Sequence, residues 1–241
     1  NENVRRIYEE LGDAMGVACI QYYLAASLPY QDDSLAPRAV ELAREAVEVF
    51  RAHRWHGWTA SALGAQGYAL WVAGEHAAAV DALQEAYALH EQLNEVGFLP
   101  ELQAYQGLAH LGLGQQAEAL ACTRRALMAL AQGMLDSEVV SEVYYAHAVV
   151  LSAYGHEEEA QDYLVRAYQN LLTYAAQLED DEARRAFFYR DPTIRRLMAE
   201  VYARGIAPDP DQGVVTRRVV ARTGHRRVPA RVTLDAGPPG E

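Results

Sequence analysis

The sequence predicts an all-α fold, an α-solenoid of about four stacked helix pairs that repeat every 40 residues. Three observations predict it. Small residues recur at a constant spacing, a glycine stands at the same distance before most of them, and apolar residues recur at helical spacing between them. The alternation typical of strands is absent before residue 213. With 241 residues, 51% of them hydrophobic, the chain is long and apolar enough to bury a core.

Two sets of alanines fix the register of the repeat. The first set, with spacings of 40, 40 and 41 residues, is Ala39, Ala79, Ala119 and Ala160. The second set follows seven residues later as Ala46, Ala86, Ala126 and Ala167. Seven residues make about two turns of an α-helix, so both alanines of a unit lie on one helix face. We expect these short side chains to let neighbouring helices approach closely.

A turn-forming residue precedes each alanine of the first set by five positions: Ser34, Gly74, Gly114 and Gly155. Glycine tolerates the left-handed conformation that ends one helix and lets the next begin. Each unit is therefore a helix, a tight turn and a second helix. In chain order the helices are expected at residues 13–28, 36–52, 57–73, 76–93, 98–112, 116–132, 137–153 and 157–178. The opening "NVRRIYEELGD" resembles the ends of the second helices, which indicates a start within a repeat.

Two further helices, at residues 180–189 and 192–204, are expected to cap the apolar end of the stack. Asp191 is suited to the N-cap of the second helix, and Pro192 is suited to its first turn. The side chains expected to close the core are Phe187, Phe188 and Leu197. Residues 1–205 then form one helical array with its cap.

The composition changes in the tail, residues 206–241, which holds five of the nine prolines and six arginines against four acidic residues. Its weak alternation and the sequence Thr223-Gly224-His225 are compatible with a short β-hairpin. We interpret the tail as a linker that packs on the array or on a partner's sheet edge. A nucleic-acid contact or the start of a basic domain is the alternative, less favoured because no aromatic residues are interleaved with the arginines.

The glycine and alanine positions resemble those of the tetratricopeptide repeat. The pattern is Gly67, Gly74, Ala79 and Ala86 in one unit, and Gly107, Gly114, Ala119 and Ala126 in the next. The resemblance covers roughly residues 13–178 and implies a right-handed solenoid. The unit has 40 residues instead of the 34 of the basic motif, so longer helices are expected. A rival class, with two helices per 40 to 47 residues, usually lacks the Gly-x4-Ala-x6-Ala spacing.

Stretched repeats of this kind look like the C-terminal arrays of STAND-type ATPases, including the maltose-regulator-like bacterial transcription activators. A segment that often follows the last repeat in that group is similar to the one containing Glu182, Arg184, Arg185, Phe187, Pro192 and Arg195. Arg190-Asp191 departs from the Asn-Val-like pair expected before the proline. The chain contains no nucleotide-binding domain, so the resemblance carries over no ATPase activity.

Charge and composition exclude several classes of function. A net charge of −12 would repel nucleic acid and anionic membranes, at least from the repeat array. The chain has no lysine, which removes a phosphate-loop lysine and a Schiff-base lysine. Cys19 and Cys122 lie in helical apolar patterns and are read as reduced thiols. With no leader sequence and no apolar run near 18 residues, we expect a cytoplasmic protein.

Three short motifs resemble functional sites but have structural explanations. "GLGQQA" matches a dinucleotide fingerprint, but it follows a helix instead of a strand and is read as the repeat turn. "HEEEA" lacks the second histidine of a zinc-protease helix and is read as an acidic first turn. "HRWHGW" would need further ligands to hold a metal, so packing of its tryptophans is preferred. We expect no metal and no cofactor.

No nucleophile is paired with a base by local spacing, and we expect no catalysis. The leading hypothesis is a module that binds a protein or peptide, self-association included, as the sensor or oligomerisation arm of a larger STAND-type protein. A domain that binds a small-molecule inducer is the alternative, and an enzyme fragment is the third. The expected groove residues, each with core packing or a solvated rim as the competing explanation, are Ser61, Tyr68, Trp71, Glu101, Leu108, Glu142 and Tyr145.

Overall fold

A computed structural model describes residues 2–131, 137–178, 180, 187–188 and 192–207. The chain divides into two compact units, Asn1–Ile206 and Ala207–Glu241. All elements below belong to the first unit. The predicted N-cap Asp191 and the predicted hairpin of the tail lie outside the described residues.

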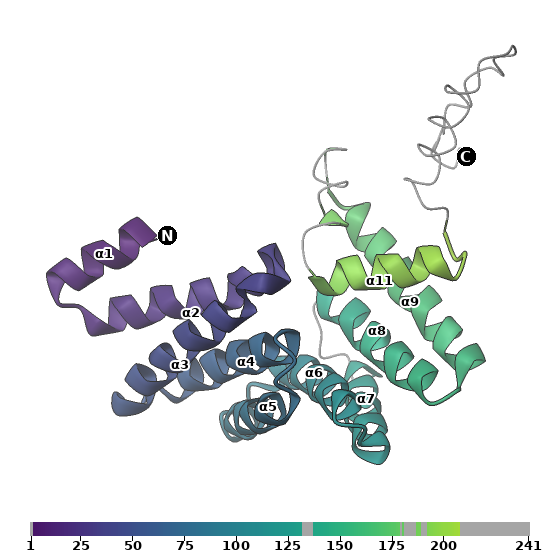
Figure 1. Ribbon diagram of the computed structural model, residues 1–241, viewed down its shortest axis with the longest axis horizontal. Coiled ribbons are helices and arrows are strands. Elements are labelled where there is room, and N and C mark those ends of the chain that lie inside the picture. Colours follow the sequence, from purple (N-terminus) through teal and green to yellow (C-terminus); the bar gives the residue numbers. More distant parts are fainter. Residues whose placement is uncertain (1, 132–136, 179, 181–186, 189–191, 208–241) are drawn as a thin grey trace, which may run out of the picture. The chain divides into compact units, whose positions relative to one another are not determined.

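The described residues form helices and no strand, which confirms an all-α fold (Figure 1). Four helix pairs follow one another along the chain: α2 (Ala14–Gln31) with α3 (Ala36–Ala52), α4 (His56–Val72) with α5 (His76–Gln92), α6 (Leu99–Gly112) with α7 (Gln116–Ala131), and α8 (Ser137–Ala153) with α9 (Glu157–Ala175). They are preceded by α1 (Glu2–Leu11) and followed by α11 (Pro192–Ala203). Short 3₁₀ turns, η1 (Asp33–Leu35) and η2 (Val96–Phe98), precede α3 and α6.

The predicted helix positions are close to those observed, apart from the predicted helix at residues 180–189, most of which lies outside the described residues. The largest differences are at the C-terminal ends of α2, which continues to Gln31, and of α9, which stops at Ala175. In α2 the helix runs through Pro29. It ends where the Asp32 N–H donates to the carbonyl oxygen of Leu28 at 3.2 Å. Pro29 therefore does not end α2, whereas Pro192 begins α11 as predicted.

The eight alanines that define the repeat are buried without exception, in keeping with the small-residue packing that the spacing predicts. The fully inaccessible residues are Ala39, Ala46, Ala79, Ala86, Ala119, Ala126, Ala160 and Ala167. Gly67 and Gly107 bring the two helices of a pair together in the same way. A Cβ at Gly67 would lie 2.5 Å from Leu83 Cγ, and one at Gly107 would lie 2.5 Å from Thr123 Cγ2. Small residues thus set the close spacing inside each pair.

The turns between paired helices use glycine as predicted in three of four units. Gly74, Gly114 and Gly155 have φ of +81°, +71° and +82°. Ser34 differs, because it lies in η1, where its N–H donates to Asp32 Oδ1 at 2.8 Å. In this unit the Asp32 side chain stabilises the turn, whereas in the other units a glycine with positive φ forms it.

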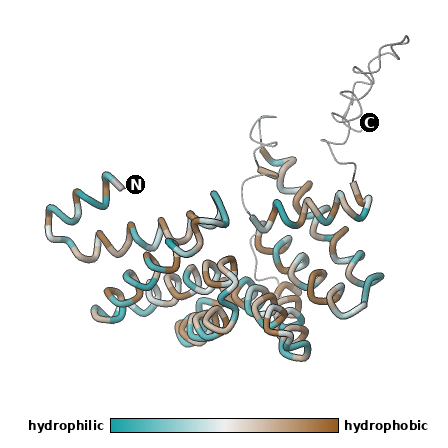
Figure 2. The backbone as a smooth tube through the Cα atoms, in the orientation of Figure 1, coloured by the Kyte–Doolittle hydropathy of each residue, from teal (hydrophilic) through white to brown (hydrophobic). Residues whose placement is uncertain are grey.

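Neighbouring pairs pack through the second helix of one pair and the first helix of the next, as α3 does on α4, α5 on α6 and α7 on α8. The first helices also contact one another in order, α2 with α4, α4 with α6 and α6 with α8. We call the surface formed by α2, α4, α6 and α8 the first-helix face. Figure 2 shows hydrophobic and hydrophilic residues alternating along the helices, as expected for helices that each bury one side. No described helix is long and apolar enough to cross a lipid bilayer.

The last helix, α11, covers the end of the stack and also reaches back to its beginning. Leu197 and Val201 are almost completely buried, and Phe187 stacks on Tyr174 of α9 with ring centroids 5.2 Å apart. Of the three residues expected to close the core, Phe187 and Leu197 are buried, whereas Phe188 is half-buried. α11 contacts α8 and α9, and it also contacts α2 of the first pair. The sequence predicted the cap but not this second contact.

Candidate ligand-binding site

Three of the predicted groove residues lie around one pocket. Ser61 and Tyr68 of α4 and Glu101 of α6 line a cavity of about 140 Å³ on the first-helix face. Aromatic residues that were not predicted complete its wall: Tyr22 and Tyr30 of α2, Phe98 of η2 and Tyr105 of α6. The pocket therefore draws its lining from three consecutive helix pairs.

Helical spacing places these side chains together. Ser61 and Tyr68 are seven residues apart on one face of α4, and Glu101 and Tyr105 are four apart on α6. Gly64, between the two α4 residues, leaves room in the floor of the pocket. A Cβ at Gly64 would lie 3.2 Å from Leu102 Cδ2, and any larger side chain would fill part of the cavity.

The aromatic rings form a continuous row along the first-helix face. Tyr30 stacks on Tyr68 with ring centroids 5.1 Å apart, and Tyr68 tilts against Tyr105 at 4.7 Å. Trp71 adjoins both, at 5.8 Å from Tyr68 and 5.7 Å from Tyr105. Aromatic pairs at these separations attract each other beyond the area they bury, so contacts between the rings stabilise the row.

Glu101 is the carboxylate of this pocket. Within the described part of the chain, no group donates a hydrogen bond to it or forms an ion pair with it. Burial, which disfavours its charged form, raises the pKa of Glu101 to about 7. Glu142, another predicted groove residue, is instead engaged by the Tyr105 hydroxyl, which donates to Glu142 Oε2. Burial and the nearby Glu142 charge raise the pKa of Tyr105 well above its ordinary value.

Trp71 and Tyr145, two further predicted groove residues, lie close to side chains of α11. The guanidinium carbon of Arg196 lies 4.8 Å from the Trp71 ring centroid, and Arg196 also pairs with Asp33 of η1. Burial raises the pKa of Tyr145 to about 12, while Arg196 and Glu200 act on it in opposite directions.

Two further contacts hold α11 on the first-helix face. The hydroxyls of Tyr68 and Thr193 lie 3.3 Å apart, and Arg195 Nη1 donates to the carbonyl oxygen of Tyr30 at 3.3 Å. The predicted groove surface is thus partly occupied by the chain's own last helix. Leu108, the remaining predicted groove residue, is 4% exposed and belongs to the main hydrophobic core. Leu108 is therefore a core residue and does not line a groove.

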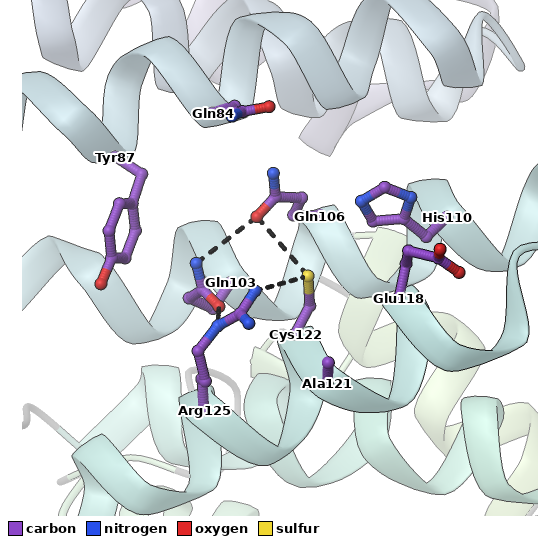
Figure 3. A pocket seen from close by; sticks show the side chains of 9 residues that line it. All are labelled: Gln84, Tyr87, Gln103, Gln106, His110, Glu118, Ala121, Cys122 and Arg125. Atoms are coloured by element: carbon purple, nitrogen blue, oxygen red, sulfur yellow. Dashed lines mark hydrogen bonds between the residues drawn. The ribbon is translucent and has the colours of Figure 1, made fainter.

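A second hollow, of about 510 Å³, opens between α5, α6 and α7 (Figure 3). Its floor is a polar network: Arg125 Nε donates to Gln103 Oε1 at 2.7 Å, and Gln103 Nε2 donates to Gln106 Oε1 at 3.4 Å. Arg125 also donates to Cys122 Sγ at 3.2 Å. Sequence reasoning missed this site. The available signal was the pair of glutamines three residues apart within an apolar helix, which now prove buried.

The short motifs occupy the places that the structural explanations assign to them. "GLGQQA" is the turn from α6 to α7, and "HEEEA" begins α9 with its three glutamates in the first turn. In "HRWHGW", His53 Nδ1 lies 2.8 Å from the carbonyl oxygen of Val49. Trp58 packs against Phe50 with ring centroids 5.6 Å apart. Among the residues described, no cluster of three or more His, Cys, Asp or Glu side chains is placed to hold a metal ion.

Neither a protein-family model nor a curated protein matches the chain. The site is therefore interpreted from its own geometry.

Proposed function

We propose that the chain is a non-catalytic binding module that recognises a protein or peptide segment on its first-helix face. The observation that supports this proposal best is the docking of α11 on that face. Arg196 lies over Trp71, and Thr193 meets Tyr68. A surface that holds one helix through an aromatic anchor, a guanidinium and a buried hydroxyl contact has the chemistry to hold a similar helix from elsewhere.

In this proposal the helix pairs form a right-handed solenoid of tetratricopeptide-like repeats, α11 is its capping helix, and the tail is a linker or short hairpin. The buried alanines at 40-residue intervals support a repeat of this type. The module would serve as the sensor or oligomerisation arm of a larger bacterial regulator of the STAND type. Cys19 and Cys122 are free thiols, which supports a reducing compartment such as the cytoplasm.

A labelled peptide with the sequence of residues 192–204 tests recognition on the first-helix face. The acceptor is the full chain carrying Arg196→Glu, because the substitution places a negative charge beside Asp33 and weakens the hold of the chain's own α11. We expect fluorescence anisotropy to show tighter binding to this acceptor than to the unaltered chain, whose α11 competes for the same surface. Adding Trp71→Ala to the acceptor should weaken binding several-fold.

The matched control is the same peptide with glutamate at the position of Arg196, which should bind the acceptor poorly. Equal binding of both peptides, or binding that Trp71→Ala leaves unchanged, would show that the first-helix face does not recognise the helix through these contacts.

A second candidate function is the sensing of a small molecule. It is favoured by the pocket at Glu101, which is walled by aromatic side chains and holds a few polar groups, as small-ligand sites do. In this case α11 would remain docked and the ligand would enter beside it.

A further inference from the structure

We propose that the pocket formed by α2, α4 and α6 binds an organic cation, an alkylammonium or guanidinium group, between its tyrosine rings and the Glu101 carboxylate. The inference rests on the proposed function as a binding module and names the chemistry that the pocket recognises. The cation belongs either to a free amine or to a basic side chain of a bound segment. Both sources present the same positive group to the same wall.

The first support is the composition of the pocket wall. Four tyrosines line it, namely Tyr22, Tyr30, Tyr68 and Tyr105, and Phe98 adds a fifth aromatic ring. Aromatic rings carry negative charge on their faces and attract cations that come within about 6 Å of the ring centroid. An arrangement of several rings around one small cavity is the type of site that selects ammonium groups over neutral groups of equal size.

The second support is Glu101, a carboxylate that lines the cavity and has neither a hydrogen-bond donor nor a cationic partner among the described residues. The Glu101 side chain is half-buried, and partial removal of a carboxylate from water without a counter-charge disfavours its charged form, in keeping with the raised pKa. A bound cation would supply the missing counter-charge. An anionic ligand would meet Glu101 and the nearby Glu142, and a neutral ligand would leave Glu101 as it is.

The third support is that the same aromatic row already holds a cation of this chain. The Arg196 guanidinium lies over Trp71, and the Trp71 ring adjoins Tyr68 and Tyr105 of the pocket. The Trp71 ring, which contacts Arg196 of α11, and the neighbouring pocket would thus recognise the same kind of chemical group.

The size of the cavity limits the ligand. Its volume of about 140 Å³ is below the roughly 300–1,000 Å³ of sites for drug-sized molecules. There is room for a small alkylammonium or for the end of one arginine or lysine side chain. A large metabolite would not fit unless most of it lay outside the pocket.

Titration of the full chain with choline tests the proposal, because choline stays positively charged at every pH used. Its neutral isostere, 3,3-dimethylbutan-1-ol, is the matched ligand control. Chemical-shift changes followed by NMR should show binding of choline and at least tenfold weaker binding of the alcohol. Equal affinity for the two would overturn the proposal, because the pocket would then respond to shape and not to charge.

A second arm separates the two sources of the cation. N-acetyl-arginine amide represents a peptide side chain, and choline represents a small free alkylammonium ion. Tighter binding of the arginine compound identifies a basic segment as the ligand, and tighter binding of choline identifies a free alkylammonium ion. If neither compound binds, this inference fails, while binding of the 192–204 peptide in the experiment above would still support the proposed function.

Variants then locate the site. Glu101→Gln keeps the shape of the side chain and should weaken choline binding about tenfold or more, whereas Glu158→Gln, on the exposed surface of α9, should leave it unchanged. Tyr22→Leu removes a ring and should weaken binding about two- to fivefold, and Tyr22→Phe should restore it. Unchanged affinity in both Glu101→Gln and Tyr22→Leu would place choline elsewhere and contradict the assignment.

The pH dependence gives an independent readout. With the pKa of Glu101 raised to about 7, its carboxylate is charged above that pH and neutral below it, so choline should bind more tightly as the pH rises through 7. The other titratable groups around the pocket are His90 of α5, with Glu95 beside it, Glu142 of α8 beside Tyr105, and the four tyrosines, Tyr22, Tyr30, Tyr68 and Tyr105. The pH dependence should disappear in Glu101→Gln. If it persists there, one of these other groups causes it and Glu101 is not the ligand's counter-charge.

Discussion

Arg196 lies over the indole ring of Trp71, its guanidinium carbon 4.8 Å from the ring centroid. The two residues belong to the capping helix and to the second helix pair, and the same guanidinium pairs with Asp33 in the first. A helix expected only to cap the end of the stack is therefore bound to its beginning as well.

This relationship predicts an energetic coupling between Arg196 and Trp71. A double-mutant cycle with Arg196→Ala and Trp71→Leu, measured by chemical unfolding, should give a coupling free energy of about 0.5–1 kcal/mol. The value is small because Arg196 is partly exposed and solvent screens its charge. The matched control pairs Arg38→Ala with Trp71→Leu, because Arg38 forms an exposed ion pair with Glu41 that is remote in sequence from α11. A coupling as small as that of the control would mean that the ring and the guanidinium are neighbours without interaction.

The close packing around Gly107 predicts that adding a single methyl group there lowers the free energy of unfolding. In Gly107→Ala the new Cβ would lie 2.5 Å from Thr123 Cγ2 and 3.1 Å from the carbonyl oxygen of Ala119, so α6 and α7 must separate. The expected cost is about 1–3 kcal/mol, less the gain in helix propensity of up to about 1 kcal/mol. Gly97→Ala is the control, because nothing lies within 4 Å of its Cβ position. If thermal unfolding gives Gly107→Ala and Gly97→Ala the same change in melting temperature, close helix packing at Gly107 is contradicted.

The helix pairs could be predicted from sequence because their determinants are local and repeated. Alanines seven residues apart and a glycine five residues before them specify a helix face and a turn without reference to the rest of the chain. Because the pattern recurs at nearly constant spacing, each copy supports the positions assigned to the others. Ser34 shows the limit of this approach, since a different turn replaces the left-handed glycine where the spacing is the same.

The site could be predicted only in part, because its geometry depends on contacts between distant segments. Ser61, Tyr68 and Glu101 were selected by their repeat position, and they do line one pocket. Tyr22 and Tyr30 lie in α2, where no motif distinguishes them from other apolar positions. The contacts of Trp71 and Tyr68 with α11 join residues that no local pattern relates.

Gly114 predicts a backbone effect that is separate from packing. Its φ of +71° is unfavourable for residues with a Cβ, but the space around it is open, with nothing within 4 Å of the Cβ position. Gly114→Ala should therefore cost about 1–2 kcal/mol through conformation alone. Gly114→Asn should cost less, since asparagine tolerates this region and Asn94 already adopts a φ of +59° in this chain. Equal losses in calorimetry for the two variants would point to a steric cause instead.

His147 predicts a loss of stability in acid. Its side chain is 2% exposed, its Nδ1 lies 2.8 Å from Thr123 Oγ1, and its ring meets Tyr163 edge to face at 4.6 Å. Burial lowers the pKa of His147 from 6.5 to about 4, against a smaller raising effect of Glu159. Because the unfolded chain takes up this proton first, the free energy of unfolding should fall as the pH drops from about 6.5 to about 4, by on the order of 3 kcal/mol from this group.

His147→Gln keeps a polar side chain beside Thr123 but cannot titrate, so its stability should decline less over that pH range. The comparison with the unaltered chain removes the contribution of the carboxylates, which protonate in both proteins. If urea unfolding at pH 7 and pH 4 gives the same difference for His147→Gln as for the unaltered chain, then His147 either binds its proton without unfolding or is not buried as a neutral ring.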